Sequence, residues 1–148
     1  MTKALITGIT GMVGSHLADY LIDNTDWDVC GLLRWNDRMD NIEHLMPSIN
    51  EKNRVSLVYG DINDLSSLLV ALEKIKPNYV FHLAAQSYPK TSFDSPLETL
   101  ETNILGTAKL LDAIKILNLD PVIHVCASSE VFGRVPKECL PIHEDVGL

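Results

Sequence analysis

Short apolar runs alternate along the chain with longer segments in which apolar residues recur every three to four positions. Runs of four to six mostly apolar residues are typical of strands, and a 3.6-residue recurrence is typical of helices with one buried face. The pattern predicts strands at 3–7, 28–33, 55–59, 79–83 and 122–127, and helices at 11–24, 65–75 and 96–117. Residues 45–53, around Pro47, are expected to form a loop or a short helix.

The alternation of strands and helices predicts an α/β fold. The run YVFHL at 79–83 is almost continuously apolar, which indicates a parallel strand buried on both faces. Right-handed crossovers then give a doubly wound parallel sheet of the Rossmann type, with strand order 3-2-1-4-5. Residues 1–148 are about one domain in length. Because the pattern dissolves after Gly133 and a sixth strand is absent, we expect the N-terminal piece of a longer protein.

Three glycines connect the first predicted strand to the first predicted helix, in the spacing G-x-x-G-x-x-G. Gly8 allows a tight turn, Gly11 lets the backbone approach a pyrophosphate, and Gly14 lets the helix pack against the strand. The free N–H groups at the helix start then face the phosphates with a favourable dipole. The turn therefore predicts a dinucleotide-binding domain.

The end of the second strand distinguishes between the two nicotinamide dinucleotides. NAD sites usually have Asp or Glu here for the ribose 2′-hydroxyl, whereas an arginine suits the 2′-phosphate of NADP. Arg34 stands at this point, so the sequence predicts NADP, with Arg38 as a second candidate cation. Asp37 and Asp40 follow closely and keep NAD possible, and a solvated polar loop is the simpler alternative.

The third and fourth strands also end in candidate cofactor contacts. Asp61 could accept a hydrogen bond from the adenine amino group, beside the N–H of Ile62, or it could cap the following helix. The small Ala84 and Ala85 would let the cofactor ribose lie against the backbone. Ser87 and Tyr88 would then point towards the group that lies past the nicotinamide.

The fifth strand ends in Ser128-Ser129-Glu130. Ligands of open α/β sheets bind at the carboxyl ends of the strands. A hydroxyl and a carboxylate two residues apart at that edge suit proton chemistry at a sugar carbonyl. A serine-rich turn is the alternative. His82, inside a strand, is interpreted as a packed histidine rather than a ligand.

Composition narrows the possible partners. A net charge of −8 argues against nucleic acid. No apolar run approaches the ~18 residues of a membrane span, and no signal peptide precedes the first strand. The three cysteines match no zinc pattern, and the five histidines form no close pair, so no metal is expected. Cys30 and Cys126 lie in apolar runs and are expected to be buried thiols, which suits the cytoplasm.

Several motifs in order resemble one family, the extended short-chain dehydrogenase/reductases, which include nucleotide-sugar epimerases and dehydratases. The resemblance spans the whole chain and is greatest for the GDP-mannose 4,6-dehydratase branch, through Arg34, Ala85-Gln86-Ser87 and Ser128-x-Glu130. The motifs are Thr7-Gly8-x-x-Gly11-x-x-Gly14, Gly60-Asp61, His82-Leu83-Ala84-Ala85-Gln86-Ser87, Thr102-Asn103-Ile104-x-Gly106-Thr107 and Ser128-Ser129-Glu130-Val131-Phe132-Gly133.

The resemblance implies an NADP-dependent dehydratase that acts on a nucleotide-diphosphate sugar and forms homo-oligomers as a complete protein. Ser128 would hydrogen-bond the sugar O4, and Glu130 would take the C5 proton and help to expel the C6 hydroxyl. Ser87 and Ser129 would bind substrate. The implied cofactor-binding residues are Gly8, Thr10, Gly11, Met12, Val13, Gly14, Arg34, Asp61, Ile62, Leu83, Ala84, Ala85 and Ser87.

The chain departs from the family in one respect. The family's Tyr-x-x-x-Lys motif, which supplies the base for O4, does not occur in these 148 residues. We therefore expect the chain to end before that motif and before the C-terminal substrate subdomain, and to be inactive alone. A 4-epimerase and a 4-keto-sugar reductase are the alternatives on the same scaffold. A non-catalytic dinucleotide-sensing module is the alternative from another class.

Overall fold

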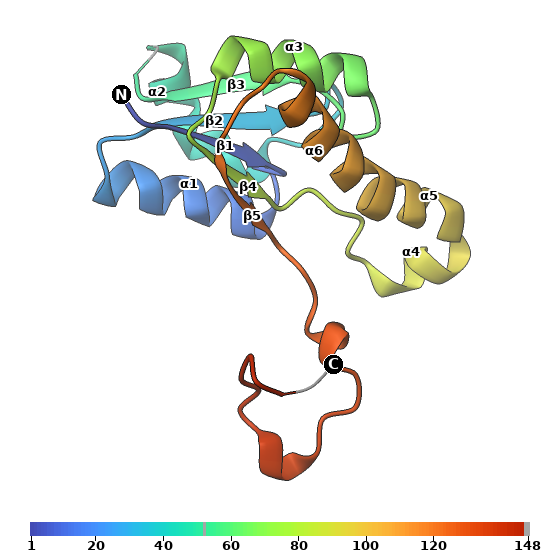
Figure 1. The fold of residues 1–148 in the computed structure, drawn as a ribbon. Helices are drawn as coiled ribbons and strands as arrows, with labels where there is room; N and C mark the ends of the chain where they lie inside the picture. Colours follow the sequence, from blue (N-terminus) through green and yellow to red (C-terminus); the bar gives the residue numbers. More distant parts are fainter. Residues whose placement is uncertain (52, 147–148) are drawn as a thin grey trace.

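The computed structural model describes residues 1–51 and 53–146, and it confirms a five-stranded parallel sheet in the order β3-β2-β1-β4-β5 (Figure 1). The strands are β1 (Lys3–Thr7), β2 (Asp28–Leu33), β3 (Val55–Tyr59), β4 (Tyr79–His82) and β5 (Val122–Val125). The α-helices are α1 (Met12–Asn24), α2 (Met46–Asn50), α3 (Leu65–Ile75), α4 (Pro89–Asp94), α5 (Pro96–Leu100) and α6 (Gly106–Ile116). A 3₁₀ segment, η1 (Asp40–Leu45), precedes α2.

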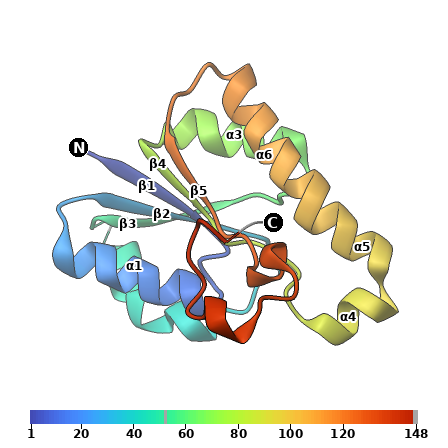
Figure 2. The same ribbon diagram turned by 60° about the horizontal axis from the view of Figure 1, so that its bottom comes forward.

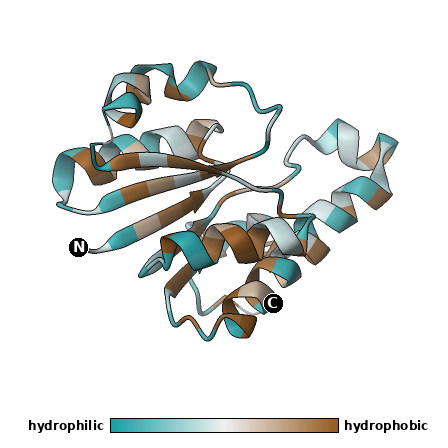
Figure 3. Ribbon diagram, turned by 90° about the horizontal axis from the view of Figure 1, so that it is seen from above, coloured by the Kyte–Doolittle hydropathy of each residue, from teal (hydrophilic) through white to brown (hydrophobic). Residues whose placement is uncertain are grey.

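Two hydrophobic clusters hold helices to the two faces of the sheet. Leu5 of β1 belongs to the cluster that receives α3 and α6, whereas its neighbours Ala4 and Ile6 belong to the cluster that receives α1 and η1. Successive side chains of a strand point to opposite faces, so β1 contributes to both clusters. Figure 2 shows α1 and the α3–α6 pair on opposite sides of the sheet, and Figure 3 shows the strands as largely hydrophobic bands.

The helix expected at 96–117 is built in three parts. α5 leads into a five-residue π-helical turn, η2 (Glu101–Leu105), and α6 follows from Gly106. An ideal Cβ built on Gly106 would lie 3.1 Å from the side chain of Ile62, so a glycine allows the helix to pass close to the segment after β3. The helix α4 was not predicted, because its six residues are too few to show a helical apolar stripe.

Four element ends differ from the prediction by one or two residues, including α6, which ends at Ile116 rather than Leu117. α1 begins at Met12 rather than Gly11, because Gly11 keeps an extended backbone as the N-cap. β4 ends at His82, where its partner β1 ends at Thr7. β5 ends at Val125, although the Cys126 N–H still donates to the carbonyl of His82 (3.1 Å).

The segment after β5 has little regular structure, as predicted, and runs away from the sheet in Figure 1. It contains two short 3₁₀ turns, η3 (Ser129–Phe132) and η4 (Lys137–Cys139). The expectation that Cys126 is buried was wrong: it follows an edge strand whose outer side is exposed. Cys30 is buried as expected, and burial raises the pKa of its thiol.

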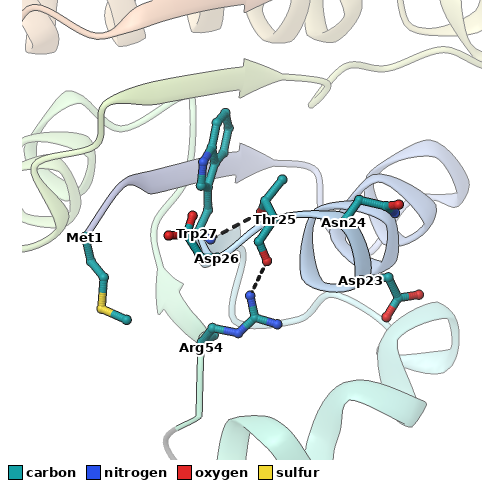
Figure 4. A pocket seen from close by; sticks show the side chains of 7 residues that line it. All are labelled: Met1, Asp23, Asn24, Thr25, Asp26, Trp27 and Arg54. Carbon is teal, nitrogen blue, oxygen red and sulfur yellow. Dashed lines mark hydrogen bonds between the residues drawn. The ribbon is translucent and has the colours of Figure 1, made fainter.

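Arg54 closes the end of α1 (Figure 4). Its guanidinium donates to the carbonyl oxygens of Ile22 (2.6 Å) and Thr25 (2.5 Å). A cation at a helix C-terminus satisfies carbonyls that have no partner within the helix and complements the helix dipole. A pocket beside Arg54 is lined by Met1, Asp23, Asn24, Thr25, Asp26 and Trp27, and the position of Arg54 in it is explained by helix capping. Nearby, Trp27 stacks on Tyr79 with ring centroids 4.3 Å apart.

A chain of hydrogen bonds joins β1, β4 and α6 through the buried His82. Thr7 Oγ1 accepts from the N–H groups of Leu83 and Ala84 (3.2 Å each), so its own proton goes to His82 Nδ1 (2.8 Å). His82 Nε2–H then donates to Thr107 Oγ1 (3.0 Å). This assigns the neutral Nε2–H tautomer to His82. His82 is thus a packed histidine, as the sequence predicted.

Burial lowers the pKa of His82 below the ordinary value of 6.5. Between the folded-state pKa and about pH 6.5, the unfolded chain binds more protons, so the free energy of unfolding decreases as the pH is lowered through this window. We expect urea unfolding at several pH values to show this loss. In His82→Gln the acid-side loss should shrink, and at pH 8 the variant should be less stable by about 1–3 kcal/mol because buried hydroxyls lose partners.

The matched control is His143→Gln, in the exposed C-terminal segment, which should keep the wild-type pH profile. An unchanged acid-side loss of stability in His82→Gln would contradict the lowered pKa of His82.

No helix within residues 1–51 and 53–146 is both long enough and apolar enough to cross a membrane.

Candidate functional site

A cleft of about 590 Å³ opens at the carboxyl ends of β1 to β4. The strand order reverses between β1 and β4, and ligands of doubly wound sheets bind at such a switch point. Every residue predicted to bind the cofactor lines this one cleft: Gly8, Thr10, Gly11, Met12, Val13, Gly14, Arg34, Asp61, Ile62, Leu83, Ala84, Ala85 and Ser87. The structure thus brings together four segments that are far apart in the sequence.

The glycine turn forms the floor of the cleft at the start of α1. Gly8 adopts a positive φ of 73°, a conformation open to glycine at little cost. An ideal Cβ on Gly14 would lie 2.2 Å from the carbonyl oxygen of Gly8, so only glycine lets the helix pack this closely on the turn.

The N-terminus of α1 offers donors to an anion. Gly11, the N-cap, makes no side-chain capping bond, and the first intrahelical bond runs from Ser15 N–H to the Gly11 carbonyl (3.0 Å). The N–H groups of Met12, Val13 and Gly14 therefore precede any intrahelical partner. Uncapped N–H groups at a helix start bind phosphate oxygens well, so this end of the cleft fits the pyrophosphate of a dinucleotide.

Arg34 lies in the cleft together with Asp37, which forms an ion pair with it. Arg34 Nε and Nη2 each approach Asp37 Oδ1 at 2.9 Å, and the Arg34 main-chain N–H donates to Oδ2 at 2.9 Å. The Asp37 side chain is 15% exposed and that of Arg34 is 66% exposed. Arg38 pairs instead with Asp40 (3.0 Å), and neither of them lines the cleft.

After β3, different acidic residues take the two roles considered for Asp61, namely contact with the cofactor and capping of the next helix. Asp64 is the N-cap of α3, where its Oδ1 accepts from Ser66 N–H (3.0 Å). Asp61 remains in the cleft, and its Oδ1 accepts from Asn63 N–H (2.8 Å). Asn63 also lines the cleft and was missed by the sequence reasoning. Its buried side-chain oxygen has no hydrogen-bond partner among the described residues.

The loop after β4 is held by the π-helical turn η2. Asn103 accepts from Gln86 N–H through Oδ1 (2.8 Å) and donates to the Gln86 carbonyl through Nδ2 (3.0 Å). Gln86 Nε2 also donates to Thr99 Oγ1 (3.2 Å). These bonds fix the backbone that presents Ser87 to the cleft. Asn103 belongs to the motif Thr102-Asn103-Ile104-x-Gly106-Thr107, so the sequence did point to this residue. Its partner Gln86 lies 17 positions away, and spacing along the chain does not reveal this contact.

Tyr88, which the sequence placed beside Ser87, also lines the cleft. Gln86, Glu98 and Thr102 line it as well, and sequence reasoning missed these contacts. No cluster of three His, Cys, Asp or Glu residues suited to a metal ion occurs among the described residues.

Ser87, which is predicted to contact both cofactor and substrate, lines this cleft, whereas the predicted catalytic residues Ser128 and Glu130 are not part of its lining. Ser128 is the N-cap of η3, where its Oγ accepts from Glu130 N–H (3.2 Å), and both residues are exposed. Ser129 belongs to η3, but its side chain lies outside what the structure describes. Figure 1 shows the segment after β5 running away from the sheet. Their proposed roles stay predictions.

Solved structures of nucleotide-sugar enzymes share this fold. The UDP-glucose 4-epimerase of Bifidobacterium longum, in complex with NAD⁺ and UDP, is 26% identical with a TM-score of 0.82, and the match covers 99% of this chain and 42% of that one. The UDP-glucose 4-epimerase of Stenotrophomonas maltophila, with bound NAD and formylated UDP-arabinopyranose, has a TM-score of 0.83 at 22% identity. This match covers 99% of this chain and 42% of that one.

Curated relatives point to one family. The GDP-mannose 4,6 dehydratase of Drosophila melanogaster is 39% identical over 138 residues, covering 89% of this chain and 35% of the relative. The human GDP-mannose 4,6 dehydratase is 35% identical over 150 residues, covering 95% and 40%. The chain thus spans well under half the length of these relatives. The profile of the GDP-mannose 4,6 dehydratase family matches residues 5–147, and the chain therefore belongs to this family.

Proposed function

We propose that this chain is the cofactor-binding part of an NADP-dependent nucleotide-sugar 4,6-dehydratase that acts on GDP-mannose or a close analogue. The observation that carries the proposal is the single cleft, which gathers the glycine turn, Arg34 and the ends of β3 and β4. The names of the relatives support the substrate class and the dehydration.

Each part of the cleft has a task in holding NADP. The N–H groups at the start of α1 bind the pyrophosphate. Arg34 binds the 2′-phosphate as a charge-assisted donor, and Asp61 with the Ile62 N–H binds the adenine. The small Ala84 and Ala85 let the nicotinamide ribose lie against the backbone that Thr7 and Asn103 fix.

The chemistry at the sugar falls to the segment after β5. Bound NADP⁺ would supply the redox chemistry, accepting a hydride from the sugar C4 and, once reduced, donating it to C6, while the O4 proton would go to the tyrosine of the family's Tyr-x-x-x-Lys motif. The resulting ketone acidifies the C5 proton, and Glu130 removes this proton and assists the departure of the C6 hydroxyl as water. Ser128 hydrogen-bonds O4, while Ser87 and Ser129 contact the sugar.

Two other activities fit the same scaffold. A 4-epimerase is favoured by the solved structures, which are epimerases, and a 4-keto-sugar reductase would use the same Ser128-x-Glu130 pair. The carboxylate at Glu130 and the family membership favour dehydration over epimerisation. A dinucleotide sensor would bind the cofactor and release no product.

We also propose that the protein works in the cytoplasm. All three cysteines are free thiols, and free thiols suit a reducing compartment.

Arg34→Ala should weaken the binding of NADP by roughly 10- to 100-fold, because a charge-assisted contact to phosphate contributes about 1.5–3 kcal/mol. NAD, which has no 2′-phosphate, should change by less than about threefold. Titration calorimetry with the purified protein measures both constants, and Arg38→Ala is the matched control. An equal loss for the two cofactors would contradict the assignment.

The complete protein, incubated with GDP-mannose and NADP in deuterated water, should release a 4-keto product that has lost one water and gained deuterium at C5. Glu130→Gln should abolish the deuterium incorporation, because the amide cannot take the C5 proton. Glu138→Gln, in the same exposed segment, is the control. Mass spectrometry reads both changes. An epimerised sugar of unchanged mass would favour the epimerase, and absence of any product would favour the sensor.

The complete protein should be a homo-oligomer by light scattering. Support comes from exposed apolar side chains along α4, α5 and η2, namely Phe93, Leu97, Leu100 and Ile104. The paired substitution Leu97→Glu and Ile104→Glu should lower the mass to that of a monomer, because buried unpaired carboxylates are costly. Tyr20→Glu, equally exposed on α1, should leave the mass unchanged. An oligomer that survives the paired substitution would exclude this surface.

A further inference from the structure

The carboxylate of Asp37 lies against the cation that the proposed cofactor needs. It accepts from Nε, Nη2 and the main-chain N–H of Arg34. The carbonyl of Arg34 in turn accepts from the Asp37 N–H (3.2 Å). The two residues thus form one closed turn at the end of β2, and both line the cleft.

This ion pair has two opposing effects on a 2′-phosphate. The bonds hold the Arg34 guanidinium in one orientation and leave the N–H groups of Nη1 for a ligand. The carboxylate also offsets the positive charge of Arg34 and repels the phosphate. Because the Asp37 side chain is mostly buried while Arg34 is mostly exposed, the carboxylate is the less screened of the two charges, and the repulsion outweighs the gain from orientation.

The same carboxylate suits the cofactor without the phosphate. A ribose with a free 2′-hydroxyl is a hydrogen-bond donor, and a carboxylate at the end of the second strand is the usual acceptor for it. Within the cleft lining, Asp37 is the acidic residue that neighbours Arg34. The arginine and the carboxylate thus favour different cofactors from one site.

We propose that Asp37 is a specificity-determining residue, which restrains Arg34 and lets the site accept NAD beside NADP. The inference rests on the proposed function, because it requires a nicotinamide dinucleotide in the cleft. It adds that the preference for NADP is limited by a residue of the chain itself.

The test compares Asp37→Asn with the wild type by titration calorimetry, using NADP⁺, NAD⁺, 2′,5′-ADP and 5′-AMP as ligands at fixed ionic strength. The amide keeps an oxygen to accept from the Arg34 N–H but removes the charge. We expect NADP⁺ and 2′,5′-ADP to bind roughly tenfold tighter and NAD⁺ to bind several-fold weaker. Asp37→Ala removes both the charge and the acceptor oxygen. It should shift the ratio of NADP⁺ to NAD⁺ affinity in the same direction, which would show that the effect does not come from the new amide.

Two controls isolate the ion pair. Asp40→Asn removes the same charge from the exposed pair outside the cleft and should leave the ratio of the two cofactors unchanged. In the background of Arg34→Ala, the gain in NADP⁺ binding from Asp37→Asn should vanish, because no released cation remains. Thermal unfolding checks that each variant is folded.

The outcomes separate this inference from the proposed function. If the wild type binds a dinucleotide but Asp37→Asn weakens NADP⁺ or leaves the ratio unchanged, Asp37 merely orients Arg34 and the inference is wrong. If the wild type binds neither dinucleotide, the proposed function fails and the inference with it.

Discussion

The hydroxyl of Thr7 is the point on which the cleft depends. It accepts from two successive N–H groups after β4 and donates to the buried His82, so the end of β1 and the end of β4 are fixed to each other. Thr107 continues this chain by bonding His82 and the main-chain carbonyl of Asn103 (2.7 Å). Because the strand order reverses between β1 and β4, the separation of these strand ends decides whether a ligand fits between the glycine turn and the alanines.

The electrostatics of the site are local and do not follow the net charge. The chain carries a charge of −8, yet the cleft offers an anion the N–H groups of a helix start and one guanidinium. Lys109 bonds the carbonyl of Asn63, a residue of the cleft lining, and pairs with Glu101. Arg54 precedes β3, at the opposite edge of the sheet, and caps α1. Affinity for a dinucleotide thus depends on backbone geometry and on the balance between Arg34 and Asp37.

The fold and most of the cofactor site could be predicted because their signals are local. Buried parallel strands read as continuous apolar runs, and the glycine turn is a contiguous motif. The predictions failed where the deciding contact is distant or the element is short. α4 is too brief to show a periodicity, Cys126 lies beside a strand edge that nothing described covers, and the clamp between Asn103 and Gln86 joins two separate segments.

By itself the sequence determined the parallel α/β fold, its strand order and the dinucleotide turn, because each follows from residue type and spacing along a short segment. Only the tertiary structure decided which polar residues share the cleft, how His82 is protonated and that Arg34 faces Asp37 as a closed pair. It also separated Asp61 in the cleft from Asp64 at the helix cap. These outcomes depend on distances between strand ends and on competition for hydrogen-bond partners, and packing of the whole sheet sets both.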